Sequence, residues 1–419
     1  MGLEKKFETY TNDLCKQIRN KDVHASIRLE INDHLHTLKE EAMRTGLSEE
    51  EAIDQALTYI GDAAILGKQL NETHKAPIDV KTILLVLGAC LFGLLVMYYL
   101  QFHSAFTNLR DMKVFNKSLG FYLFGALLMF SLSTFDYRRL FMYSWHLYIA
   151  THVALLFSVL FGVKVNGVPY LSLNYFNINL IDITPFLLAI SFAGIFQSWD
   201  WRDRSKSWLG VGVLSLPIIL LYTTGALSTI IISMIVCIAI MHASTANLKQ
   251  IIIFSVVASI YPIVNLLFHS QEYTLFSLYI APGLGTTEGL HVTSELIPDV
   301  HTDLIFAYII YSFGWVAGIT IFMLFVFFIC RVLSTAKSVK LAYGRMLITG
   351  LAATFATKFI LSILTNLGLF PFLLGVSIPF MSFGGSHILL EMMAVGLFLS
   401  IYRRRRIGDI FWQDMKYNS

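Results

Sequence analysis

Ten long apolar runs follow one another from Lys81 onward, and they constrain the fold of this chain more than any other feature. Each run is about 16–28 residues long, which as a helix is enough, or nearly enough, to cross ~30 Å of hydrocarbon. Backbone polar groups inside a bilayer must bond to one another, so the runs predict helices rather than open strands. The expected fold is an all-α polytopic membrane protein with about ten transmembrane helices. These are expected near residues 82–102, 116–135, 141–163, 180–198, 208–223, 225–243, 249–269, 304–331, 345–369 and 386–402.

Composition agrees with a chain that faces lipid. Hydrophobic residues make up 56% of the sequence and charged residues only 14%, whereas soluble domains carry about 25% charged residues. An ordinary soluble enzyme, a disordered chain and a collagen-like chain are therefore excluded. The four cysteines show no pairing in loops and no zinc spacing, so neither a disulfide framework nor a zinc site is predicted.

Residues 1–76 differ from the rest in charge and in pattern. The first 75 residues hold 14 of the 28 acids and 10 of the 31 bases, a net charge of −4, which leaves +7 for the remainder. Helical apolar spacing and the capping-box pair Ser48 and Glu51 predict a small cytosolic helical domain. The segment lacks the apolar core of a signal peptide and resembles the short helical prefix of some bacterial membrane permeases. We expect it to be a cytosolic docking or regulatory module.

The distribution of Lys and Arg predicts how the chain lies in the membrane. Bases concentrate on alternate loops, as the positive-inside rule requires of cytosolic loops, and no base occurs between Lys249 and Arg331. With the membrane domain placed at residues 80–402, an even number of helices puts both termini in the cytosol. Residues 403–419 then form a basic tail, whose Arg403 to Arg406 predict contact with anionic lipid and not with nucleic acid.

The loop at residues 270–303 is the longest outer segment, and its charge is purely acidic. A loop of about 30 residues is too long for a mere connection. Its carboxylates favour either a divalent cation site or a solvated acidic loop. A nucleotide site is discounted because ATP is absent from the outer face. The charged and titratable residues of the loop are Glu272, Glu288, His291, Glu295, Asp299, His301 and Asp303.

Two acids near the outer ends of helices are candidates for chemistry. Asp303 opens a long apolar helix, where it is either an N-cap or a carboxylate able to accept a proton or bind a metal. Glu391 lies about a turn and a half inside the last helix. An acid there is costly in lipid and usually faces a polar interior, so proton-coupled transport is a second possibility.

The runs PDVHTDLIFA at residues 298–307 and PFMSFGGS at residues 379–386 resemble two motifs of the SEDS family (shape, elongation, division and sporulation), the FtsW/RodA/SpoVE group. The run PDVHTDLIFA at residues 298–307 resembles the family's PE-x-HTDFIFA motif. Asn366-Leu367-Gly368, followed by PFMSFGGS at residues 379–386, resembles the second signature, NxG … PFxSYGGSS. The ten predicted helices and the predicted cytosolic termini match as well.

The resemblance implies a peptidoglycan glycosyltransferase that polymerises lipid II at the outer face of the bacterial cytoplasmic membrane, for cell shape, division or sporulation. It implies Asp303 as the general base. A divalent cation (Mg or Mn) would bridge the leaving pyrophosphate, with Asp303, Asp299 and Glu295 as ligands, and no organic cofactor is expected. A class B penicillin-binding protein would cross-link the product. The implied substrate-binding residues are His301, Thr302, Lys113, Lys117, Lys164, Ser382, Gly384, Gly385 and Ser386.

The chain also departs from the family pattern, and two alternatives stay open. Glu288 stands where the family has a base, and the QPSE segment becomes Ile181-Asp182-Ile183-Thr184. One alternative is a non-catalytic scaffold that binds lipid II or a penicillin-binding protein. The other is a flippase or transporter of a lipid-linked precursor that uses Glu391 and the outer loop.

Overall fold

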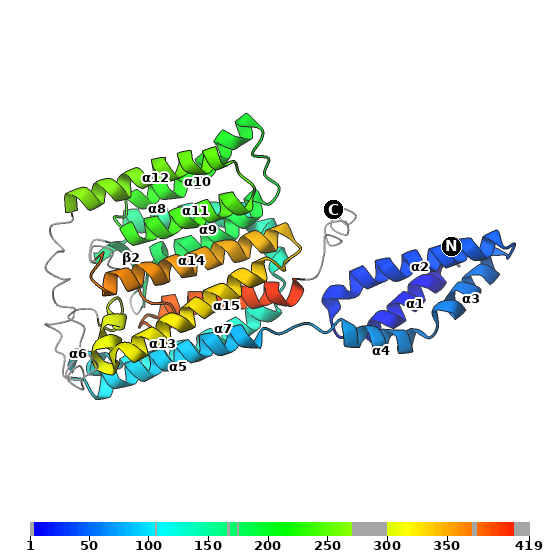
Figure 1. Cartoon of the computed structure of the whole chain (residues 1–419), viewed down its shortest axis with the longest axis horizontal. Helices are drawn as coiled ribbons and strands as arrows, with labels where there is room; N and C mark the ends of the chain where they lie inside the picture. The colour runs from blue at the N-terminus through cyan, green and yellow to red at the C-terminus, as the bar shows by residue number, and fades with distance from the viewer. Residues whose placement is uncertain are drawn as a thin grey trace. The chain divides into compact units, whose positions relative to one another are not determined.

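The chain divides into two compact units. The computed structural model describes residues 4–104, 107–165, 168–173, 176–269, 300–370 and 375–405. One unit comprises residues 1–78 together with 403–419, and the other comprises residues 79–402. Figure 1 shows the elements of both units.

The first unit is a small bundle of helices with its own core. Its elements are α1 (Glu4–Lys16), the short 3₁₀ helix η1 (Lys21–Val23), α2 (His24–Arg44), α3 (Glu49–Ile60) and α4 (Ala63–Thr73). Two apolar clusters hold these helices together. One contains Phe7, Leu35, Ile53 and Ala56, and the other contains Leu14, Cys15, Ile18 and Ile27.

The predicted capping box at the start of α3 is present. The Ser48 hydroxyl accepts the Glu51 N–H, and the Glu51 carboxylate accepts the Ser48 N–H at 3.1 Å. These bonds satisfy two amide groups that the first turn of a helix otherwise leaves unpaired. Hydrogen bonds from the Ser48 hydroxyl and backbone also hold the pKa of Glu51 below its ordinary value of 4.5.

Replacing Ser48 should therefore loosen α3 without affecting the membrane domain. We expect Ser48→Ala to lower the local stability of α3 by about 1 kcal/mol, measured by hydrogen exchange in the full-length protein. Ser48→Asp keeps a capping oxygen and is the matched control. The pKa of Glu51 is lower in the folded chain than in the unfolded chain. The contribution of Glu51 to the stability of α3 is therefore complete above pH 4.5, and it is lost as the pH falls through the folded pKa. Equal exchange rates in α3 for the two variants would contradict this account.

The second unit is the membrane domain, and the predicted helices are confirmed there. Among the described residues, eight helices are long and apolar enough to span a membrane, and Leu180–Phe196 and Leu227–Ala243 are shorter apolar helices. The unit consists of α5 (Val80–Phe102), α6 (Thr107–Met112), α7 (Val114–Thr134), η2 (Tyr137–Tyr143), α8 (Ser144–Phe161), α9 (Leu180–Phe196), α10 (Arg204–Tyr222), α11 (Leu227–Ala243), α12 (Leu248–His269), α13 (Ile305–Ala336), α14 (Ala342–Asn366) and α15 (Gly385–Arg404).

A small sheet between α8 and α9 was not predicted. Strands β1 (Val163–Val165), β2 (Val168–Leu173) and β3 (Phe176–Ile178) pair antiparallel in the order β1-β2-β3. The register pairs Val163 with Tyr170 and Leu171 with Ile178. The strands extend the connection between two apolar helices and leave the all-α membrane fold intact.

Helix α14 lies at the centre of the membrane domain. It contacts α9, α11 and α13, and Figure 1 shows it between these neighbours. Each helix contains an apolar stretch of 18 residues. In α14, 72% of this stretch is buried inside the protein, and in α15 67% is buried, against 11% in α12. Most side chains of α14 and α15 therefore face protein, while α12 presents apolar side chains outward, as expected of a helix in lipid.

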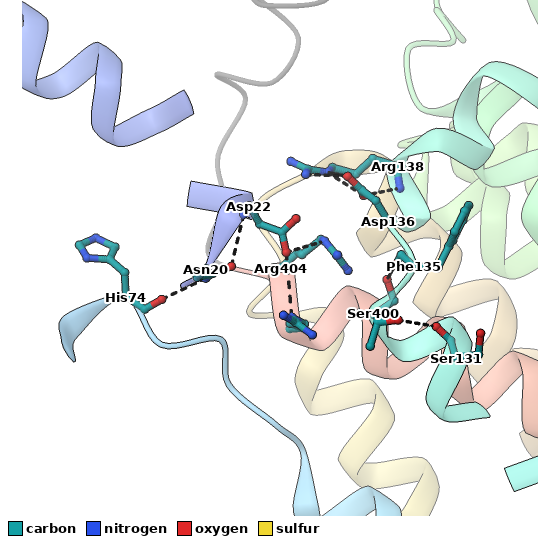
Figure 2. A network of polar contacts seen from close by, with 11 residues as sticks. Asn20, Asp22, His74, Ser131, Phe135, Asp136, Arg138, Ser400 and Arg404 are labelled. Carbon is teal, nitrogen blue, oxygen red and sulfur yellow. Dashed lines mark hydrogen bonds and ion pairs between the residues drawn. The ribbon is translucent and has the colours of Figure 1, made fainter. Parts of the chain in front are cut away.

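Polar contacts join helices at the end of the bundle at which α5 begins. Arg331 of α13 donates to both carboxylate oxygens of Asp79, the residue before α5, and to the Tyr402 hydroxyl. The Asp136–Arg138 pair, part of an Asp-Tyr-Arg run after α7, closes at 2.7 Å (Figure 2). Nearby, the Ser400 hydroxyl of α15 donates to the Phe135 carbonyl (Figure 2).

Candidate functional site

Asp303 lies in the turn that precedes α13, and its carboxylate is held by a distant backbone group. Its Oδ2 accepts the N–H of Gly375 at 2.8 Å, across 72 residues of sequence. Gly375 has a φ of +87°, a conformation that favours glycine. The N-cap of α13 is Leu304, so the alternative of Asp303 as an N-cap is wrong. Its half-buried carboxylate is instead directed toward the segment that follows α14.

Asn366 joins the start of α13 to the end of α14. Its side-chain oxygen accepts the Ala307 N–H at 2.9 Å, and its amide donates to the Asp303 carbonyl at 2.8 Å. The same amide donates to the Ser362 carbonyl, one turn earlier in α14. Asn366 is fully buried, so each of these groups would otherwise lack a partner away from water. The asparagine of the second motif therefore fixes the backbone that carries Asp303.

The segment 375–384 brings the second motif against the first. The Phe383 N–H donates to the His301 carbonyl at 2.8 Å, and the two rings lie 5.5 Å apart. Ser382 is buried, whereas His301 and Thr302 are half-buried. The segment ends at Gly384, with φ +157°, immediately before α15 begins at Gly385.

The start of α15 adds a polar backbone surface to this region. A Cβ at Gly385 would lie 2.5 Å from the Phe121 ring of α7, so only glycine fits there. Gly385 and Ser386 are the first residues of a 20-residue helix, whose initial N–H groups attract anions. Two motifs about 65–80 residues apart in sequence thus form one polar surface at this end of the bundle.

The predicted lysines lie at the same end of the domain. Lys113 has a φ of +53° just before α7, Lys117 is in the first turn of α7, and Lys164 is in β1. All three side chains are exposed. Figure 1 shows α6 and β2 at the end of the bundle where α13 begins. Glu295 and Asp299 lie outside the described residues.

A second buried polar cluster, which sequence reasoning did not identify as a site, centres on Asp182 in the first turn of α9. Its Oδ2 lies 3.4 Å from His387 Nε2 of α15 and accepts the Asn179 amide at 2.8 Å. Its Oδ1 accepts the Thr229 hydroxyl of α11 at 3.2 Å. The start of α9 is thereby linked to α11 and to the first turn of α15. The signal was an acid in an apolar run, which in a membrane is expected to find polar partners.

Lys358 of α14 and Glu391 of α15 form an ion pair inside the bundle. The lysine Nζ lies 2.7 Å from Glu391 Oε1, and the residues are 6% and 1% exposed. Glu391 Oε2 accepts the Phe380 N–H at 2.7 Å. Glu391 is the acid on which the transport alternative depends, and its pairing with Lys358 was not predicted. The available signal was a base in the middle of one apolar run and an acid inside another.

The metal prediction rests on one described residue. Within the described ranges no group of three or more His, Cys, Asp and Glu side chains is placed to hold a metal ion. Asp303 is the only one of the three predicted ligands that lies among the described residues. Glu295 and Asp299 are the other two.

The membrane domain matches a known family over most of its length. A family profile described as FtsW/RodA/SpoVE, cell cycle protein, matches residues 80–293 and 280–407. The chain belongs to this family. A probable peptidoglycan glycosyltransferase FtsW of Trichlorobacter lovleyi is 24% identical over 375 residues, which cover 81% of this chain and 97% of that protein. Stage V sporulation protein E of Bacillus subtilis is 33% identical over 110 residues, 26% of this chain and 30% of that protein.

Solved structures show the same fold. A chain of a peptidoglycan synthase complex aligns with a TM-score of 0.67 and 18% identity, covering 80% of this chain and 100% of that chain. The rod shape determining protein RodA of Thermus thermophilus aligns with a TM-score of 0.61 and 16% identity, covering 78% and 97%. The sequence therefore shows the family, and the solved structures show the fold of the membrane domain.

Proposed function

We propose that this chain is a peptidoglycan glycosyltransferase that polymerises lipid II. The observation that carries the proposal is the meeting of its two motifs. Gly375 N–H bonds to the Asp303 carboxylate, and Phe383 N–H bonds to the His301 carbonyl. The FtsW relative bears the name probable peptidoglycan glycosyltransferase, which agrees with this reaction.

Asp303 is proposed as the general base. Its carboxylate takes the proton of the attacking sugar hydroxyl while the new bond forms at the anomeric carbon of the other strand. The bond to undecaprenyl pyrophosphate breaks in the same step, and the electron pair leaves with the pyrophosphate. The Gly375 hydrogen bond supports this role because it orients the carboxylate before substrate arrives.

The leaving pyrophosphate is proposed to lie near the start of α15. The N–H groups of Gly385 and Ser386 supply hydrogen-bond donors and a positive helix end. Lys113, Lys117 and Lys164 are exposed bases at the same end of the bundle and add positive charge. His301, Thr302, Ser382 and Gly384 complete the proposed substrate surface.

A divalent cation is proposed to assist the departure of the pyrophosphate, with Asp303, Asp299 and Glu295 as its protein ligands. We expect a chelator such as EDTA to lower the rate of lipid II polymerisation about tenfold or more, because the leaving charge would lose its counterion. Added Mg²⁺ or Mn²⁺ should restore the rate. Polymerisation at the full rate by chelator-treated protein would contradict a role for the cation.

The proposed setting follows the charge pattern of the loops. The Lys and Arg bias supports a multi-pass protein of the bacterial cytoplasmic membrane with both termini in the cytosol and the Asp303 surface outside.

A class B penicillin-binding protein is the proposed partner, and one structural neighbour belongs to a peptidoglycan synthase complex. The test is polymerisation of lipid II by the purified protein with its cognate transpeptidase, compared with the Asp303→Asn variant.

The geometry favours this function over transport through Glu391. That carboxylate is engaged by Lys358 on one oxygen and by the Phe380 N–H on the other. Proton-coupled uptake into vesicles, with no glycan formed, is the result that would favour the transport alternative. A stable complex with the transpeptidase but no polymer would favour the scaffold alternative.

A further inference from the structure

The Phe380 peptide is held in an unusual conformation by two buried side chains. Phe380 has a φ of +64°, a left-handed conformation that residues other than glycine rarely adopt, and it is 1% exposed. Its N–H donates to Glu391 Oε2 of α15 at 2.7 Å. Its carbonyl accepts the Tyr122 hydroxyl of α7 at 2.7 Å. Strain of this kind persists only where the surroundings impose it.

The acceptor for the Phe380 N–H is itself fixed by a buried cation. Glu391 Oε1 lies 2.7 Å from Lys358 Nζ, which also lies 5.8 Å from the centre of the Phe186 ring of α9. Two charges taken out of water gain little net stability, because desolvation offsets their attraction. A buried pair that also orders backbone therefore points to a role other than stability.

Phe380 belongs to the segment that forms the proposed active site. Gly375, five residues earlier, donates to the Asp303 carboxylate, and Phe383, three residues later, donates to the His301 carbonyl. The segment also lies directly on α5, since a Cβ at Gly93 would come within 2.8 Å of the Met381 Cα. A rotation of the Phe380 peptide would therefore move donors that orient Asp303 and His301.

We propose that Lys358 and Glu391 are positioning residues for the glycosyl transfer. The pair holds the Phe380 peptide in its left-handed conformation, and this fixes the segment 375–384 against the Asp303 turn. Lys358 keeps the carboxylate in place, and Glu391 makes the contact with the backbone. The part that concerns catalysis rests on the proposed function, whereas the part that concerns the conformation of the segment does not.

Two double variants of equal size separate the hydrogen bond from the charge. Lys358→Met with Glu391→Gln removes both charges and keeps an oxygen for the Phe380 N–H. Lys358→Met with Glu391→Met removes the charges and also the oxygen. We expect the second pair to have a kcat about tenfold or more below that of the first pair, with little difference in KM, because only the second pair leaves the Phe380 N–H without an acceptor.

Hydrogen exchange of the peptides that contain residues 375–384 gives a second readout, independent of activity. Exchange should be faster for the Met pair than for the Gln pair. Tyr122→Phe should accelerate exchange in the same segment, because the Phe380 carbonyl loses its partner. This third variant leaves the buried charges intact, so it tests whether the hold on the Phe380 peptide fixes the segment even if either double variant fails to fold.

The kinetic and exchange results together distinguish failure of the positioning proposal from failure of the proposed function. Equal kcat and equal exchange in the Gln and Met pairs would overturn the positioning proposal. Faster exchange in the Met pair, with no polymer from any variant or from wild type, would support the role in conformation and contradict the proposed function instead. Loss of kcat in the Met pair, together with faster exchange, would support the proposal in full.

Discussion

Asp303→Asn is expected to lower the rate of lipid II polymerisation by about 10²–10⁴-fold, the range that general base catalysis contributes. The amide oxygen of asparagine can still accept the Gly375 N–H, so the turn before α13 should keep its structure. What is lost is the ability to take up the proton of the attacking hydroxyl. The measurement is the initial rate of undecaprenyl pyrophosphate release by the purified protein with its transpeptidase.

The control for Asp303→Asn is Asp111→Asn, which makes the same chemical change on the exposed helix α6. That variant should release undecaprenyl pyrophosphate at close to the wild-type rate. Lipid II binding should also be similar in both variants, because the proposed base acts on the transition state more than on the bound substrate. Equal loss of rate in the two variants would indicate a general effect of surface charge and would contradict the assignment of Asp303.

Asn366→Leu is expected to lower the rate by about 10²-fold, the effect of a small displacement of a catalytic group. Leucine is similar in size but leaves the Ala307 N–H and the Asp303 carbonyl without their side-chain partner. Losing partners for buried groups should also reduce the free energy of unfolding by about 1–3 kcal/mol. Steady-state kinetics and thermal unfolding in detergent measure the two effects.

Ser362→Ala is the matched control for Asn366→Leu. The Ser362 hydroxyl lies 3.5 Å from the Asn366 amide, at the limit of a hydrogen bond, while the Ser362 carbonyl that accepts from Asn366 is unchanged. We expect kcat within about twofold of wild type for this variant. Wild-type kcat in Asn366→Leu would mean that the bond to the Asp303 carbonyl does not orient the base.

The sequence predicted the helices well because the membrane imposes a simple rule. A run long enough and apolar enough to cross the bilayer has to be a helix, and the run at residues 345–369 appears as α14 over Ala342–Asn366. The Ser48–Glu51 capping box was equally local, since its two partners lie within one turn. The strands β1–β3 were missed because segments of three to six residues carry little periodic signal.

The site was predicted in part, and the missing part is tertiary. Asp303 and the PFMSFGGS segment were identified from their motifs, but nothing local joins the Asp303 carboxylate to Gly375. The pairing of Lys358 with Glu391 depends on the rotation of α14 and α15 about their axes, which side-chain packing decides. The roles of Glu295 and Asp299 stay predictions.

Gel analysis of the glycan made from lipid II tests the central claim most directly. Purified protein with its cognate transpeptidase should yield a ladder of polymer, and the same preparation carrying Asp303→Asn should yield none. The transpeptidase alone, without this chain, is the blank. Equal amounts of glycan, large or small, from wild type and Asp303→Asn would contradict catalysis by this protein.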